Sequence, residues 1–359
     1  MSHPSADQPI NILVWGKAFL KSWTAHLNGK TLAELNAHPR DDQISFQKEG
    51  HLYTIRSKTG HPVSMTTLIS RSFPPFEADK VIRNMMTGRR WKEGQSPHLP
   101  LAIEVLGQLW MMQTQATQAK IAAHPNQPEA IDVPIITPSY DLADSTQAVP
   151  PPPILLSEGD RAFFRGILLS PKWSNSPLFQ PVSDGIKNRW ATDNAKKADL
   201  GTDMHEQIED FFNGRMVEIP DTPEFRLFLE WWREFSEKYP QYQPGRTEWT
   251  LYDEDWMVSG SIDFALFGPD GEVIIVDWKR TQEIKYSNDF TKGFAPLNHL
   301  DDCNYVHYGL QQNGYRYMVE TKYDRQVVGM YLVVCHPKQD HYQMIELPDL
   351  QTEIKQIWP

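Results

Sequence analysis

The clearest pattern of hydrophobic and polar positions predicts a β-hairpin in the C-terminal half of the chain. Residues 260–267 and 273–280 flank a Gly-Pro-Asp-Gly turn at 268–271, and the second segment opens with the unbroken apolar run 273–276. Gly, Pro and Asp are residues that tight turns need. An unbroken apolar strand is typical of the buried centre of a sheet. The pattern therefore predicts a hairpin whose second strand lies in the core.

Further strands and helices are expected on both sides of this hairpin. Residues 246–252 alternate in hydrophobicity, 302–320 have apolar positions at helical spacing, and 327–335 form a second wholly apolar strand. Three successive strands can pair through short turns, and a fourth strand that follows a helix should lie parallel to one of them. The sequence therefore predicts an α/β (α+β) fold, with a central mixed β-sheet flanked by helices in the order αβββαβ.

The remaining segments give less distinct patterns. The helix expected at 76–86 should turn Val81, Ile82, Met85 and Met86 inward. The other expected elements are a short strand at 10–15, a hairpin from 44–47 and 51–55, helices over 184–213, 224–239 and 350–358, and an edge strand at 341–347.

Residues 112–158 differ in composition from the rest of the chain. They begin with a Gln/Thr/Ala-rich stretch and include a run of four prolines at 150–153. Such a segment cannot build a core and tends towards extended chain. We therefore expect a linker or surface insertion at about 112–158, within a domain over 44–359 that follows an accessory segment over 1–43.

Composition narrows the classes of function. The chain has 359 residues, 40% of them hydrophobic, and a net charge of −11, which favours a globular protein over a broadly basic nucleic-acid coat. Its two cysteines, Cys303 and Cys335, exclude a disulfide scaffold, a four-cysteine zinc site and a four-cysteine iron–sulfur cluster. Neither a signal peptide nor a membrane-spanning segment is recognisable, so we expect a cytoplasmic protein without a membrane partner.

Charged residues interrupt the expected hairpin where its buried strand ends. Asp277 and Lys279, two residues apart, share one face of the strand, and Trp278 points to the other face. Asp263, on the neighbouring strand, is expected close to them. Carboxylates at the edge of a hydrophobic sheet are costly to desolvate unless they are paired or bind a metal ion. A hard cation such as Mg²⁺ prefers such oxygen ligands.

Basic residues gather in one short stretch of this acidic chain. Arg83, Arg89, Arg90 and Lys92 lie on the polar side of the helix expected at 76–86 or just after it. A solvated helix face is the ordinary interpretation for any one of them. The cluster as a whole predicts a patch for the phosphate backbone of a nucleic acid.

The order of these residues resembles that of a known family. The matching positions are Gly201, Thr202, His205 and Glu209 on a helix, Thr247 and Glu248 opening the first strand, Gly260 and Asp263 on the second, Asp277, Trp278 and Lys279 on the third, and Gln311, Tyr315 and Glu320 on the later helix. This order resembles the PD-(D/E)XK nuclease superfamily, in particular its RecB-type and lambda-exonuclease-type branch without an iron–sulfur cluster. Residues 277–281 are especially similar to the mitochondrial genome maintenance exonuclease and to related viral and phage nucleases. The resemblance covers about 200–336 and, more weakly, 44–92.

The resemblance implies a site for Mg²⁺ or Mn²⁺. Asp263 and Asp277 would supply carboxylate oxygens to the ion. His205, the backbone carbonyl of Trp278 and Glu248 would be further ligands. The imidazole nitrogen would shift the preference of the site slightly towards Mn²⁺.

The resemblance also implies how the other matching residues act. Lys279 would position the attacking water or stabilise charge in the transition state. Gln311 and Tyr315 would contact the scissile strand or brace the lysine. The other tyrosines of that helix, Tyr308 and Tyr317, are expected to be packing residues.

The implied function is that of a DNA exonuclease in replication, repair or recombination, acting at the ends of single-stranded or unwound DNA. DNA is the expected partner, contacted by Arg280 and Thr66 as well as by the basic stretch. Replication or recombination proteins are further expected partners, and a bacterial, phage or viral origin is expected.

The sequence supports three alternatives to an exonuclease to different degrees. A structure-specific endonuclease with the same chemistry and a DNA-binding module without catalysis both stay open. A carboxylate-rich structural site in a metabolic enzyme lacks support, because the chain has no Gly-rich phosphate loop and no Ser/His/Asp signature.

Overall fold

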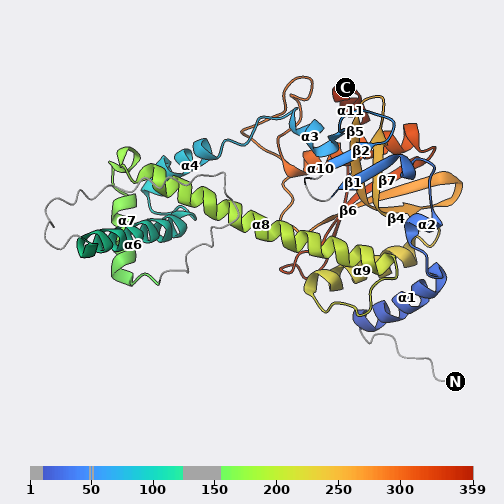
Figure 1. Cartoon of the computed structure of the whole chain (residues 1–359), viewed down its shortest axis with the longest axis horizontal. Coiled ribbons are helices and arrows are strands. Elements are labelled where there is room, and N and C mark those ends of the chain that lie inside the picture. The colour runs from blue at the N-terminus through green and yellow to red at the C-terminus, as the bar shows by residue number, and fades with distance from the viewer. Residues whose placement is uncertain (1–10, 48–49, 51, 124–154, 359) are drawn as a thin grey trace. The chain divides into compact units, whose positions relative to one another are not determined.

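The computed structural model describes residues 11–47, 50, 52–123 and 155–358 (Figure 1). The chain divides into two compact units, which we call the sheet unit (Met1–Pro75 and Lys197–Pro359) and the helical unit (Phe76–Lys196). The sequence suggested other boundaries, at residue 43 and around 112–158, and these stay predictions.

A mixed six-stranded sheet forms the centre of the sheet unit. Its strands are β3 (Val63–Ser64), β4 (Gln243–Asp253), β5 (Val258–Phe267), β6 (Glu272–Lys279), β7 (Gln326–Val334) and β8 (Gln343–Glu346). As predicted, β4, β5 and β6 pair antiparallel in succession, and β7 lies parallel to β6. The expected edge strand is β8, antiparallel to β7. The β5–β6 turn places Asp270 and Gly271 at φ of 56° and 82°, in the left-handed region that glycine adopts at little cost.

Helices cover both faces of this sheet, which is why β6 and β7 are almost wholly apolar. Along β6, Val273 and Ile275 join the hydrophobic cluster on one face, whereas Ile274, Val276 and Trp278 join the cluster on the other. The first face is covered by α3 (Met65–Ser70), α10 (Asn304–Lys322) and α11 (Gln351–Ile357). The second is covered by α1 (Ile12–Leu27), α9 (Pro223–Lys238) and the C-terminal part of α8 (Phe179–Phe212).

The N-terminal segment is helical, so the strand expected at 10–15 is wrong. The side chain of Asn11 accepts hydrogen bonds from the backbone N–H of Leu13 and of Val14, and α1 begins there. A short apolar run cannot by itself separate a strand from a buried helix. Leu20 and Leu27 of α1 lie in the same hydrophobic cluster as α9, and α2 (Leu32–Leu35) follows. Helices α1 and α2 therefore contribute buried side chains to the core of the sheet unit.

The hairpin expected at 44–55 and the helix cap expected near Ser64 are both present. The expected hairpin is formed by β1 (Ile44–Gln47) and β2 (Leu52–Ile55), which pair antiparallel. The Ser64 side chain accepts a hydrogen bond from the backbone N–H of Thr67 and caps α3. Ser and Thr favour this position because their oxygens satisfy N–H groups that a helix leaves unpaired.

The helical unit has a hydrophobic cluster of its own. The helices of this unit are α4 (Ala78–Thr87), α5 (Arg89–Lys92), α6 (Leu99–Ala123), α7 (Glu158–Leu168) and the N-terminal part of α8. Ile82 and Met86 of α4 are buried as expected, but Val81 is exposed, because it lies one position off the buried stripe. A single helix, α8, covers most of the helical segment expected at 184–213 and begins earlier.

The expected insertion at 112–158 is partly helical. Residues 112–123 form the end of α6, which corrects the extended chain expected there. Their Gln/Thr/Ala composition is compatible with a helix, and they continue the apolar helix that precedes them. Residues 124–154, with the proline run, lie outside the described residues.

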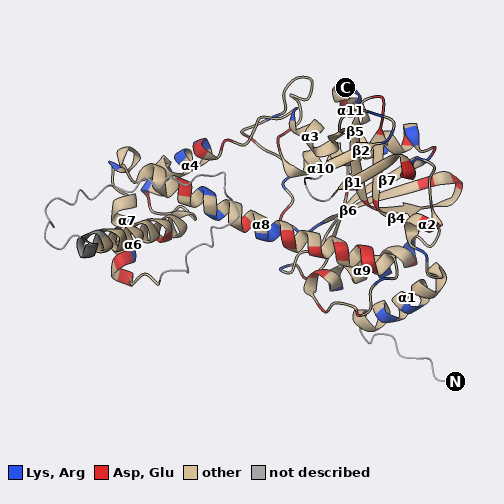
Figure 2. Ribbon diagram, viewed as in Figure 1, with Lys and Arg blue, Asp and Glu red and all other residues tan. Residues whose placement is uncertain are grey.

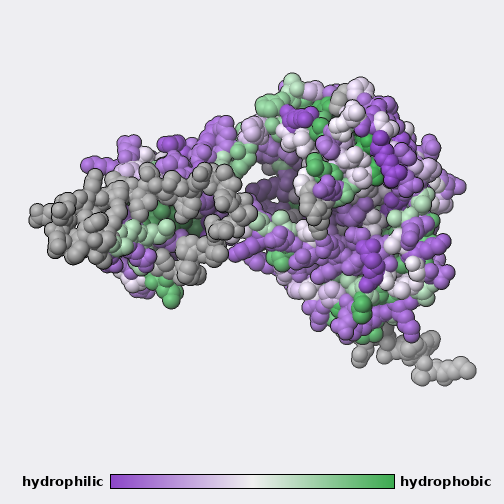
Figure 3. Space-filling model, viewed as in Figure 1, coloured by the Kyte–Doolittle hydropathy of each residue, from purple (hydrophilic) through white to green (hydrophobic). Residues whose placement is uncertain are grey.

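Among the residues that the structure describes, no helix is both long and apolar enough to cross a membrane. Hydrophilic residues cover most of the face of the sheet unit that Figure 3 shows, and hydrophobic residues occur there in small groups.

Candidate metal and hydrolysis site

Strands β5 and β6 separate where the charged residues begin. Phe264 and Val276 form the last pair of their ladder, and the next pair in this register would be Asp263 with Asp277. Strand β6 instead continues beside β7 as far as Lys279, and the first residues of β5 pair with β3. The two carboxylates therefore lie at a fork in the sheet.

Three potential metal ligands meet at this fork. Nδ1 of His205 lies 3.6 Å from Oδ2 of Asp263 and 3.9 Å from Oε1 of Glu248. One ligand atom from each of the three residues lies within 4.8 Å of the other two. They come from α8, β5 and β4, so distant parts of the sheet unit must fold correctly to bring them together.

Trp278 fixes two of these three groups through its backbone. Its N–H donates to Oδ2 of Asp263 over 3.0 Å, and its carbonyl accepts a hydrogen bond from Nε2 of His205 over 3.1 Å. The bond to Nε2 leaves Nδ1 facing the carboxylates. A partner on one imidazole nitrogen commonly sets the orientation of a metal-binding histidine. The carbonyl expected to bind the ion therefore orients His205 in this structure.

Glu248 has a strained backbone. Its φ is 43°, in the left-handed region that non-glycine residues rarely adopt, although it lies within β4. Its side chain accepts a hydrogen bond from the Ser261 hydroxyl on β5, and the preceding Thr247 accepts one from the Asn213 amide. Such strain persists only where the surroundings enforce it, and it gathers at functional sites.

Asp277 forms a second, more deeply buried group with Lys279. Its Oδ2 forms an ion pair with Nζ of Lys279, and its Oδ1 accepts a hydrogen bond from the Gln312 side chain over 2.8 Å. The lysine Nζ also lies 4.5 Å from the centre of the Tyr308 ring. Asp277 is therefore engaged with Lys279 and α10, and is not one of the three groups that converge on His205.

Burial and neighbouring charges shift the pKa values of this site. Burial lowers the pKa of His205, but the nearby Asp263 and Glu248 carboxylates outweigh it and raise that pKa to about 9. Burial raises the pKa of Asp277 against the opposing effect of Lys279. Burial lowers the pKa of Lys279, whereas Asp277 and Asp263 raise it to above its ordinary value. The fork therefore attracts positive charge.

On α10, the structure brings to the site residues that the sequence did not select. Gln311 donates to the Tyr315 hydroxyl, and Tyr315 is buried against Gly260 of β5. The side chain that reaches Asp277 is Gln312, and Tyr308, expected to be a packing residue, lies against Lys279. Residues 308 and 312 share a helix face at i, i+4 spacing, which was the signal available in the sequence.

The residues expected to bind DNA do not form one group. Thr66 lies exposed on α3, where its hydroxyl is 3.1 Å from that of Ser64. Arg280 forms a partly buried ion pair with Glu224 in the first turn of α9. Four exposed basic side chains of the helical unit are those that the sequence selected, Arg83, Arg89, Arg90 and Lys92; Arg89 pairs with Glu93 and Arg83 lies over the Phe179 ring. These four remain a candidate patch on that unit.

The donor atoms at the fork fit a divalent cation. Mn²⁺ binds both carboxylate oxygens and imidazole nitrogens, whereas Mg²⁺ prefers the carboxylate oxygens. Glu248, Asp263 and Asp277 carry three potential negative charges, whereas Lys279 and, because of its raised pKa, His205 carry positive charge. A metal ion would replace the proton of His205, because an imidazole must be neutral to bind it. A cation among these groups would offset the excess.

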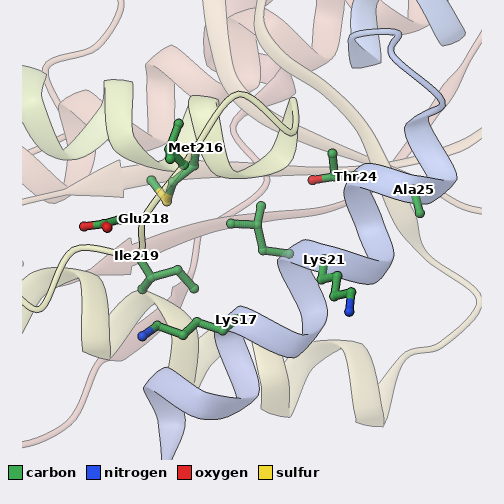
Figure 4. Close-up of a pocket in the computed structure, with 9 residues that line it drawn as sticks. Lys17, Lys21, Thr24, Ala25, Met216, Glu218 and Ile219 are labelled. Carbon is green, nitrogen blue, oxygen red and sulfur yellow. The ribbon is translucent and has the colours of Figure 1, made fainter.

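One pocket of the sheet unit is unrelated to this site. A pocket of about 770 Å³ lies between α1 and the segment that follows α8, lined by Lys17, Lys21, Thr24, Met216, Glu218 and other residues (Figure 4). None of the residues at the fork lines it.

Comparison with known proteins adds no assignment. No protein-family model matches the chain, and no curated protein matches its sequence.

Proposed function

We propose that this protein is a metal-dependent DNA exonuclease with a PD-(D/E)XK-type core, acting at the ends of single-stranded or unwound DNA. The observation that carries this proposal is the fork in the sheet, where His205, Glu248 and Asp263 converge beside the Asp277–Lys279 pair. The order of α9, β4, β5, β6, α10 and β7 supports it, because it is the order αβββαβ that the resemblance implies.

His205, Glu248 and Asp263 would hold the ion, and the Trp278 backbone would keep two of them in place. A divalent cation there would lower the pKa of a bound water and neutralise charge on the attacked phosphate. The chain itself provides the rest of the machinery.

Lys279 would supply a fixed positive charge beside the reacting phosphate. The Asp277 carboxylate and the Tyr308 ring hold its ammonium group in place, and Gln312 in turn holds Asp277. Because the side chain is largely buried, its charge is screened less than that of a surface lysine. Removing one preorganised group that stabilises transition-state charge costs about 10²–10³-fold in rate.

The test uses purified protein, with end-labelled linear and circular single-stranded DNA, in Mg²⁺, Mn²⁺ or EDTA. We expect metal-dependent loss of the linear substrate only. Asp263→Asn and Lys279→Met should each lower the rate at least about 100-fold. Matched controls are Asp324→Asn and Lys30→Gln, exposed residues that are not among the groups at the fork, which should leave the rate unchanged.

The other outcomes separate the alternatives. Cutting of the circle would replace the exonuclease with an endonuclease of the same chemistry. DNA binding without cutting in any metal would contradict the catalytic proposal and favour a DNA-binding module. Cutting that survives both fork substitutions would show that the reaction occurs elsewhere.

A further inference from the structure

Exposed aromatic side chains gather in the loop that follows Lys279. Among the described residues of the sheet unit, five Phe, Tyr or Trp side chains are exposed, and three of them are Tyr286, Phe290 and Phe294, at 57%, 94% and 50%. Scattered exposed apolar residues are normal, but three within nine residues form a concentration. Phe290 therefore gains almost none of the free energy that burial of a Phe side chain provides.

This loop is anchored by its own hydrogen bonds and buried residues. Ile284 and Leu297 are buried in the sheet-unit core. The Asn288 side chain accepts hydrogen bonds from the backbone N–H of Phe290 and Thr291, and it donates to the carbonyl of Asp302. The rings therefore project from an ordered segment, which lowers the conformational entropy that a ligand would have to remove.

Two of the three aromatic residues contact neighbouring parts of the sheet unit. Tyr286 lies against the ring of Tyr305 on α10, with 4.7 Å between the ring centres. The backbone N–H of Phe294 donates to the carbonyl of Ser72, just after α3. The loop is thus tied to the two helices α10 and α3.

The loop and the fork meet at the start of α10. Asn304, at the first position of α10, accepts a hydrogen bond from the backbone N–H of Lys285 and donates to the Glu283 carbonyl. One helical turn later, Tyr308 contacts the Lys279 ammonium group. A turn rises about 5.4 Å, so a strand with its phosphate at Lys279 could place neighbouring nucleotides on this loop.

Charge favours the same side of the site. The part of α8 that carries His205 also carries Asp203, Glu206, Glu209 and Asp210, of which Glu209 and Asp210 pair with Arg215. Red bands mark acidic residues along α8 in Figure 2, and such an acidic balance disfavours phosphate. Residues 280–300 carry the basic Arg280, Lys285 and Lys292 and the acidic Glu283 and Asp289; Arg280 is paired with Glu224 and Lys292 with Asp301. The balance of charge over these residues is near neutral, so aromatic contact with bases would dominate over phosphate contact.

We propose that residues 280–300, which we call the aromatic loop, form a stacking platform for the unpaired bases of single-stranded DNA, with Phe290 and Tyr286 as its main contacts. The platform rests on the proposed function for its substrate, and it gives that function a basis for preferring unpaired DNA. Bases stack on aromatic rings whatever their identity, whereas paired bases keep their faces buried in the duplex.

Binding is measured separately from hydrolysis, in EDTA, by fluorescence anisotropy of a labelled 20-mer of thymidine. Phe290→Ala and Tyr286→Ala should each weaken binding about 5- to 150-fold, the range found when one stacked base loses its ring. Phe290→Trp should restore binding, and Phe290→Leu should not, because leucine is apolar but cannot stack. Trp256→Ala, which removes an exposed ring elsewhere in the sheet unit, is the matched control and should leave binding unchanged.

A second binding probe separates contact with the bases from contact with the sugar-phosphate backbone. An abasic oligomer of the same length should bind the wild-type protein and Phe290→Ala equally. Thymidine binding unchanged in Phe290→Ala and Tyr286→Ala, or lost equally in Trp256→Ala, would overturn the platform. If the wild-type protein cuts DNA in that case, the proposed function stands and only the platform fails. If the wild-type protein neither binds nor cuts, both fail together.

Discussion

The contact between Gln312 and Asp277 leads to a prediction about stability that needs neither a metal ion nor a substrate. Gln312 is 1% exposed, and its amide donates to Oδ1 of Asp277, which is itself 2% exposed. Replacing Gln312 with Met keeps the length of the side chain and removes the donor. Water cannot replace the donor at such a buried position without rearrangement.

The magnitude follows from the charge and burial of the acceptor. A hydrogen bond to a charged group contributes about 1.5–3 kcal/mol to stability, and a neutral one contributes about 0.5–1.5 kcal/mol. Gln312→Met should therefore destabilise the sheet unit by about 1.5–3 kcal/mol. The matched control is Gln311→Met on the same helix, which removes a bond to the neutral Tyr315 hydroxyl and should cost about 1 kcal/mol or less.

The assay must report on the sheet unit alone, because the chain has two compact units. Hydrogen exchange followed by mass spectrometry, on peptides that cover β6, gives the opening free energy of that strand. Exchange should accelerate more in Gln312→Met than in Gln311→Met. Equal exchange in both variants, or a larger effect at Gln311, would refute the contact and the position of Asp277 derived from it.

Three more predictions concern other parts of the sheet unit. The Arg40 guanidinium lowers the pKa of Glu254 from 4.5 to about 2. The stability that this ion pair contributes is therefore complete above pH 4.5 and is lost as the pH falls towards 2. Glu254→Gln should remove about 1 kcal/mol of that acid dependence, measured in thermal melts from pH 7 to 2. Gly260→Ala should destabilise the protein by about 1–3 kcal/mol, because a Cβ there would lie 2.4 Å from a side chain of α10. Gly201→Ala, in open space on α8, should instead stabilise it by up to about 1 kcal/mol. Urea unfolding of the two variants checks the sign of each effect. Mn²⁺ at 100 times its dissociation constant should stabilise the wild-type protein by about 2.7 kcal/mol, and Asp263→Asn should lose most of this gain in a thermal-shift titration.

Much of the sheet could be predicted from the sequence because its signals are local. The apolar run at 273–276, the turn at 268–271 and the helix before 326–334 define the order and direction of four strands. The strand expected at 10–15 was wrong because six residues do not distinguish the period of a strand from that of a helix. The helical unit was not foreseen, because its limits depend on which helices pack together.

The sequence predicted which charged residues lie at the candidate site, but not the contacts that they make. Asp263, Asp277 and Lys279 lie at the fork as expected, since the register of a hairpin follows from its turn. Whether Gln311 or Gln312 faces Asp277 depends on the rotation of α10 about its axis, which tertiary packing decides. The partner that engages Arg280, Glu224, lies 56 residues away in the sequence, so its ion pair could not be read from local pattern.

The most direct test of the central claim is to locate a metal ion. Crystals grown with Mn²⁺ would be measured near the manganese absorption edge, where anomalous scattering identifies the ion. We predict a peak among His205, Glu248 and Asp263, beside the Trp278 backbone, and its loss in Asp263→Asn crystals. Manganese bound elsewhere in the crystal, with no peak at this fork, would contradict the account.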